Sequence, residues 1–220
     1  MRLFIKGVFV LLLWAVAGPL AANSSAPAIL VVGDSLSAGF GIEVSDGWVA
    51  LLQDRLNAEG YEYRVVNASI SGDTTGGGLR RLPRALERHE PAITVVELGG
   101  NDGLRATPVA IIRKNLERMI ALSRDAGSQV VLAGMQLPPN YGAAYTDAFA
   151  EVYADVAEEQ EVGLIPFFMD GVALNPEKLL PDMIHPNADG QPVLLENAWS
   201  ALKPLLAEPA RAMEAATALP

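Results

Sequence analysis

Five short apolar runs, each containing β-branched residues, alternate along the chain with longer amphipathic stretches. The runs are Ala28–Val32, Tyr63–Val66, Ile93–Leu98, Gln129–Ala133 and Val162–Pro166. Apolar runs of this kind are typical of parallel strands covered on both faces, and the stretches between them are typical of crossover helices. The alternation therefore predicts a single α/β domain built on a five-stranded parallel sheet.

The amphipathic stretches predict the helices that connect these strands. They are Trp48–Ala58, Leu79–His89, Pro108–Asp125, Tyr145–Gln160 and Gln191–Leu206. In the third helix we expect Thr107 as the N-cap, Pro108 as the first helical residue and Gly127 as the stop. Three consecutive glycines, Gly76 to Gly78, predict a flexible loop before the second helix.

The N-terminus has the features of a secretory signal peptide. Arg2 and Lys6 precede an apolar stretch, Gly7–Val16, which is followed by a Gly-Pro pair and small residues. Cleavage is expected after Ala22, or alternatively after Ala26. A membrane anchor is the weaker alternative because the apolar stretch is too short for a stable membrane span. The expected location is periplasmic or secreted.

Composition narrows the class of partner. The chain of 220 residues carries a formal charge of −10, and removing the two basic residues of the signal peptide leaves about −12, a poor match for nucleic acid. It contains no cysteine, so the folded domain needs no disulfide. We expect a monomer organised as a signal peptide (1–22), a folded domain (27–206) and a frayed or disordered tail (207–220).

Polar clusters follow successive strands, at the edge where parallel sheets bind ligands. Ser35 follows the first run, Gly72 the second and Asn101 the third, while Asp182 and His185 form a late cluster. A serine hydroxyl needs a neighbouring base to act as a nucleophile. These positions therefore predict a reactive site at the carboxyl edge of the sheet.

His185 is the candidate base for Ser35. Asp182 lies three residues earlier, a spacing that places both side chains on one side of a helix-like turn, so its carboxylate can orient the imidazole. The other histidine, His89, ends a predicted helix and is expected at the surface. Arg80, Arg81, Arg84 and Arg88 share that helix and are interpreted as a solvated face.

Three groups could donate hydrogen bonds to an oxyanion: the backbone N–H groups of Ser35 and Gly72 and the side-chain amide of Asn101. Gly72 and Asn101 could alternatively be turn-forming residues, and the neighbouring Asp34 and Asp73 are interpreted as acceptors that fix loops. A Gly-x-Ser-x-Gly elbow and a phosphate-binding P-loop are both absent from the sequence.

With these clusters, the chain resembles the SGNH (GDSL-type) hydrolases, whose four named residues correspond to Ser35, Gly72, Asn101 and His185. The stretches Val96–Arg105 and Met135–Gly142 are similar to the bacterial periplasmic branch that contains thioesterase I/lysophospholipase L1 and the arylesterases. The resemblance covers about residues 28–200. One departure is Met183, where this branch leads us to expect glycine.

The resemblance implies a flavodoxin-like three-layer α/β/α fold and hydrolysis of esters and thioesters through an acyl-enzyme: aryl esters, acyl-CoA or lysophospholipids. It implies no cofactor and no metal. Leu104, Leu137 and Tyr141 are candidate contacts for an acyl chain. Two alternatives stay open: removal of acetyl groups from carbohydrates, and an inactive module that binds acyl chains or lipid.

Overall fold

The computed structural model describes residues 26–208 and contains the predicted parallel sheet. Its strands are β1 (Ala28–Gly33), β2 (Arg64–Asn67), β3 (Pro91–Glu97), β4 (Gln129–Ala133) and β5 (Gly163–Ile165). They lie in the order β2-β1-β3-β4-β5, and every neighbouring pair is parallel. The predicted signal peptide and most of the predicted tail lie outside the described residues.

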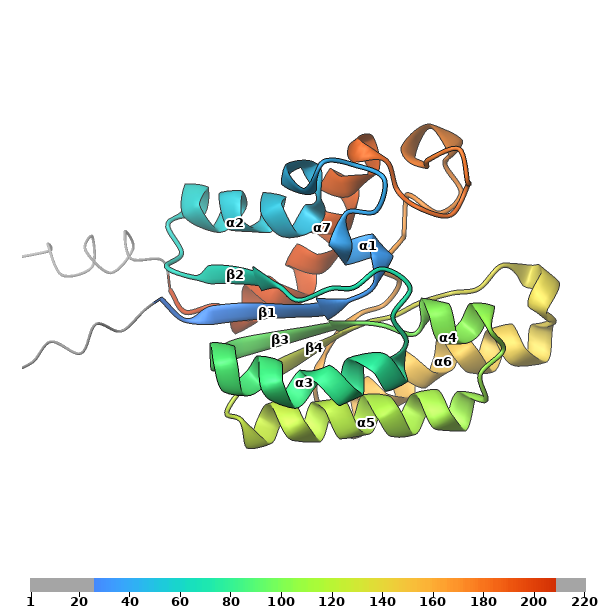
Figure 1. Ribbon diagram of the computed structural model, residues 1–220, viewed down its shortest axis with the longest axis horizontal. Helices are drawn as coiled ribbons and strands as arrows, with labels where there is room; N and C mark the ends of the chain where they lie inside the picture. The colour runs from blue at the N-terminus through green and yellow to red at the C-terminus, as the bar shows by residue number, and fades with distance from the viewer. Residues whose placement is uncertain (1–25, 209–220) are drawn as a thin grey trace, which may run out of the picture.

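Helices cover both faces of this sheet, which gives the three layers (Figure 1). One face carries α2 (Trp48–Glu59) and α7 (Gln191–Leu202), which contact each other. The other carries α3 (Thr75–His89), α5 (Val109–Asp125) and α6 (Ala143–Glu159), packed side by side. Two short helices, α1 (Ser35–Ala38) and α4 (Gly100–Leu104), lie at the carboxyl edge.

Burial follows the position of each strand in the sheet. Every residue of β1 is buried, and so is nearly all of β3 and β4, as expected for strands covered on both faces. The edge strand β2 is only half-buried. The central strands therefore hold the carboxyl edge rigidly, and the turn that follows β1 starts from a fixed point.

The glycine segment before α3 differs from the prediction of a flexible loop. Gly76, Gly77 and Gly78 lie in the first turn of α3, and Thr74 caps the helix by accepting a hydrogen bond from Gly77 N–H at 3.1 Å. A Cβ on Gly78 would lie 2.2 Å from Leu98 Cδ1. Gly78 therefore allows α3 to pack closely against the end of β3.

Two helix ends also differ from the prediction. Pro108, not Thr107, is the N-cap of α5, and its ψ of 128° keeps it outside the helix, so no side-chain cap forms. At the C-terminus of the domain, α7 ends at Leu202 and a 3₁₀ turn continues over Lys203–Leu205, because Pro204 cannot donate the next α-helical hydrogen bond. The prediction that Gly127 follows the end of α5 is confirmed, with φ at +80°.

Candidate active site

Ser35 is held at a sharp turn between β1 and α1. Asp34 caps α1 by accepting a hydrogen bond from Leu36 N–H at 3.1 Å. The turn requires glycine at position 33, since a Cβ there would lie 2.5 Å from Glu97 Oε2. Ser35 is therefore positioned from below by a buried strand, while its side chain is only partly covered.

The structure brings Ser35, His185 and Asp182 together in one hydrogen-bonded chain. His185 Nε2 lies 2.9 Å from Ser35 Oγ, and His185 Nδ1 lies 2.7 Å from Asp182 Oδ2. The other oxygen of Asp182 accepts hydrogen bonds from Ile184 N–H and His185 N–H, at 2.9 and 3.0 Å. These hydrogen bonds, those of His185 foremost, lower the pKa of Asp182 to about 2, so its carboxylate stays charged.

The turn that carries Asp182 and His185 is tied back onto itself. Leu180 N–H donates to His185 O at 2.7 Å, and Met183 N–H donates to Leu180 O at 2.9 Å. Met183 has a φ of +60°, a left-handed conformation that favours glycine. Met183 therefore stands at a position where the backbone conformation favours glycine, as the resemblance led us to expect. The side chains of Asp182, His185 and Ser35 are nevertheless in hydrogen-bond contact.

Phe40 covers one side of the imidazole. The rings of Phe40 and His185 have centroids 4.4 Å apart and are tilted by 40°. Phe40 remains 47% exposed. Sequence reasoning gave no role to this residue, because its contact depends on a turn 145 positions further along the chain.

The two predicted oxyanion donors next to Ser35 differ in how they are held. Gly72 has a φ of +79°, and a Cβ there would meet nothing within 4 Å, so its backbone borders open space. Asn101, in α4, donates its amide to Asp34 Oδ2 at 2.9 Å. One amide hydrogen of Asn101 is thus used to fix its orientation, and the second can serve a ligand.

Asp34 and Asp73 fix loops, as predicted. Asp73 accepts a hydrogen bond from Thr74 N–H at 2.9 Å and forms an ion pair with Arg81 at 2.7 Å. Arg81 also donates to Gly33 O at 3.0 Å. The prediction that Arg81 belongs to a solvated face is therefore wrong, because this side chain connects α3 to the turn before Ser35. The other three arginines of that face are exposed.

A second layer of polar groups, which the sequence did not predict, lies under Ser35. Glu97 ends β3, is fully buried, and accepts hydrogen bonds from Ser37 Oγ at 2.5 Å and Asp34 N–H at 3.3 Å. Trp48 Nε1 donates to Ser37 Oγ at 3.1 Å. Burial raises the pKa of Asp34 to about 6, and burial together with the Asp34 charge raises the pKa of Glu97 well above its usual range.

The predicted acyl-chain residues gather on the side of Asn101. Leu104 is 42% exposed, and its backbone oxygen accepts a hydrogen bond from the Tyr141 hydroxyl at 3.2 Å. Leu137 packs against α4, since a Cβ on Gly103 would lie 2.6 Å from Leu137 Cδ2. Arg105, missed in the sequence, points its guanidinium at Gly72 O from 3.4 Å.

Two other features lie away from these side chains. His89 ends α3 as predicted but is half-buried, and burial and the nearby Arg88 and Arg64 lower its pKa.

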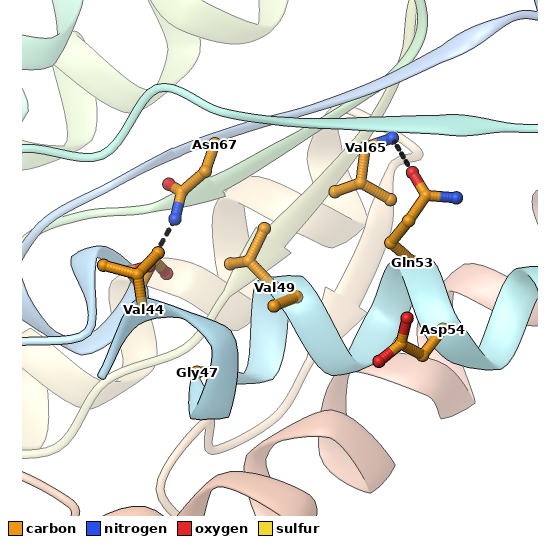
Figure 2. A pocket seen from close by; sticks show the side chains of 9 residues that line it. Val44, Gly47, Val49, Gln53, Asp54, Val65 and Asn67 are labelled. Carbon is orange, nitrogen blue, oxygen red and sulfur yellow. Dashed lines mark hydrogen bonds between the residues drawn. The ribbon is translucent and has the colours of Figure 1, made fainter. Parts of the chain in front are cut away.

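A pocket of about 320 Å³ lies between α2 and β2 (Figure 2). In its wall, Asn67 Nδ2 donates a hydrogen bond of 2.7 Å to the backbone oxygen of Ser37 in α1. The pocket therefore borders α1, but Ser35, Asp182 and His185 do not line it.

Comparison with known proteins identifies the family. Residues 31–193 match the model of the GDSL-like lipase/acylhydrolase family. The chain belongs to this family. It is 54% identical over 184 residues to an esterase named TesA from Pseudomonas aeruginosa, an alignment that covers 84% of this chain and 92% of that one.

One further relative and one solved structure extend the likeness. A thioesterase 1/protease 1/lysophospholipase L1 from Escherichia coli is 42% identical over 183 residues, covering 83% of this chain and 86% of the other. A crystal structure of TesA superposes with a TM-score of 0.80 at 55% identity and covers 81% of this chain and 99% of that one. The α/β fold is therefore that of solved members of the family.

Within residues 26–208, no cluster of three metal-ligating side chains was found. The same residues contain no helix long and apolar enough to cross a membrane.

Proposed function

We propose that this protein hydrolyses carboxylic esters and thioesters through an acyl-enzyme on Ser35. The observation that carries the proposal is the chain of hydrogen bonds from Ser35 Oγ through His185 to Asp182, with distances of 2.9 and 2.7 Å. A hydroxyl, an imidazole and a charged carboxylate in this order form a nucleophile, a general base and a group that orients the base.

The first half-reaction forms the acyl-enzyme. Ser35 Oγ forms a bond to the acyl carbon while its proton passes to His185 Nε2. The N–H groups of Ser35 and Gly72 and the free amide hydrogen of Asn101 stabilise the negative charge on the carbonyl oxygen. The bond to the leaving oxygen or sulfur then breaks, and His185 returns the proton to that atom.

The second half-reaction releases the acid. His185 takes a proton from water, and the water oxygen forms a bond to the acyl carbon. The bond to Ser35 Oγ then breaks, and His185 Nε2 returns the proton to Ser35 Oγ, which restores the free enzyme. The acyl group points away from His185, toward Leu104, Leu137 and Tyr141. Leu104 is exposed on that side, and Leu137 and Tyr141 are partly exposed, so an acyl chain is favoured over the acetyl group of a carbohydrate, the alternative substrate class.

Ser35→Ala tests the proposal. We expect turnover of p-nitrophenyl butyrate to fall to near background while far-UV circular dichroism and the urea midpoint stay within error, because the hydroxyl is only partly buried. Labelling by a fluorophosphonate should also disappear. Ser71→Ala, a serine of the loop that carries Gly72, is the control and should keep most of the activity. Unchanged turnover in Ser35→Ala would remove Ser35 as nucleophile.

We also propose that the enzyme acts outside the cytoplasm as a monomer. The basic start and short apolar stretch of the first 22 residues support export, and the negative charge of the remaining chain is unsuited to nucleic acid. Cell fractionation and N-terminal sequencing of the exported protein would identify the cleavage site, expected after Ala22 or Ala26.

A further inference from the structure

The geometry points to an apolar subsite for the alcohol half of the substrate, formed by Phe40, Met183 and Ile184. This inference rests on the proposed function and deepens it: the enzyme discriminates between esters by the apolarity of the alcohol. The subsite therefore selects esters of alkyl or aromatic alcohols over esters of polar alcohols that carry the same acyl group.

The chemistry of the reaction places the alcohol next to His185. The leaving oxygen receives its proton from His185 Nε2, so it must come within hydrogen-bond distance of that atom, about 3 Å. The carbon atoms bonded to that oxygen then lie over the groups that surround the imidazole. The acyl chain leaves the carbonyl carbon on the other side, toward Asn101 and Leu104.

Three large apolar residues lie near His185, in addition to Asp182, whose carboxylate contacts the ring. The Phe40 ring lies 4.4 Å from the His185 ring, centroid to centroid. Ile184 and Met183 directly precede His185, and consecutive Cα atoms are 3.8 Å apart, so chain connectivity keeps both close to it. Phe40, Met183 and Ile184 are 47%, 54% and 52% exposed, so their apolar area is available to a ligand.

Two turns hold this surface in place. The turn after α1 packs against the His185 turn, since a Cβ on Gly41 would lie 2.5 Å from Leu180 Cδ1. The His185 turn is closed by the hydrogen bonds of Asp182 to Ile184 N–H and His185 N–H. The apolar side chains are therefore presented by a fixed backbone, which reduces the entropy lost when an alcohol binds.

Apolar area favours an apolar alcohol at this surface. Such an alcohol gains free energy by covering the exposed apolar side chains. A polar atom in the alcohol would lose hydrogen bonds to water when it is placed against them.

The test compares two butyrate esters of equal length that differ by one atom, pentyl butyrate and 2-ethoxyethyl butyrate, with hydrolysis followed in a pH-stat. We expect the wild-type kcat/KM to favour the pentyl ester about tenfold. Met183→Gln and Ile184→Thr replace each side chain by a polar one of similar size. Each should lower the ratio of the two kcat/KM values about threefold to fivefold.

Leu174→Gln is the matched control, because Leu174 is 98% exposed and lies earlier in the same connection between β5 and α7. It should leave the ratio unchanged. A wild-type ratio near one, or an equal loss for both esters in Met183→Gln and Ile184→Thr, would overturn the subsite and leave the proposed function standing. Hydrolysis of neither ester, with no fluorophosphonate labelling of the wild type, would instead overturn the proposed function and the subsite with it.

Discussion

At the scale of single residues, the proposed function depends on the two oxygens of Asp182. Its two oxygens have separate tasks: one accepts from the His185 ring, and the other accepts from two backbone N–H groups of its own turn. The same carboxylate therefore shapes the turn and orients the base. This double use explains why an acidic residue three positions before the histidine is informative in the sequence.

Asp182→Asn should reduce kcat by a factor of about 10³ to 10⁴ with little change in KM, as expected when the group orienting the base is neutralised. The side-chain oxygen of asparagine can still accept from the backbone, so the turn should persist. Asp189→Asn, an exposed acid that follows in the next turn, should keep its activity. A loss of less than tenfold in Asp182→Asn would contradict the orienting role.

At the scale of elements, helix α3 shows how close packing supports the site. Its first turn contains three glycines, although glycine is a poor helix former. Gly78 approaches Leu98, which directly follows β3. Thr75, the first residue of α3, donates two hydrogen bonds of 2.7 Å to the carboxylate of Asp102 in α4, one from its backbone N–H and one from its hydroxyl. α3 therefore helps to hold the segment that carries Asn101.

Gly78→Ala and Gly76→Ala separate helix propensity from packing. Alanine at Gly76 would have its nearest neighbours at 3.7 Å or more, so we expect a gain of about 0.5–1 kcal/mol in the free energy of unfolding. Alanine at Gly78 would clash with Leu98 Cδ1, and overpacking should cost about 1–3 kcal/mol. Urea unfolding measures both. A gain in stability in both variants would show that the contact with Leu98 does not limit the packing of α3.

At the scale of the whole molecule, two buried carboxyl groups under the site couple stability to pH. The unfolded chain loses the Asp34 proton near pH 4, whereas the folded state keeps it up to about pH 6. Between these values the folded state binds more protons, so the free energy of unfolding falls as pH rises. Glu97 acts in the same direction and extends the effect to higher pH, because its pKa is raised well above the usual range.

The urea midpoint of the wild type should therefore decrease between pH 5.0 and pH 7.5, both above the sequence pI of about 4.6. In Asp34→Asn this decrease should be smaller, because asparagine keeps a cap for α1 and does not titrate. Asp54→Asn, an exposed acid on α2, is the control and should show the wild-type decrease. An identical decrease in Asp34→Asn would show that Asp34 is already ionised in the folded state at pH 5.0.

The sequence by itself determined the α/β class and the five strands, and it pointed to the polar residues at their carboxyl ends. Periodicity and composition are local properties, and Ser35, Gly72, Asn101, Asp182 and His185 could be found because each follows a strand or lies in a short turn. The bounds of the helices were less accurate where packing overrides local preference, as at the glycines of α3 and at Pro108.

Only the tertiary structure decided which distant residues support these groups. Glu97 beneath Ser37, Arg81 on Gly33 O, Asn101 on Asp34 and Phe40 on His185 are contacts between segments far apart in the chain. Such contacts depend on the register of the strands and on close packing, which leave no periodic signal in the sequence. For the same reason, the apolar surface beside His185 becomes visible only when the turn after α1 and the turn before α7 meet.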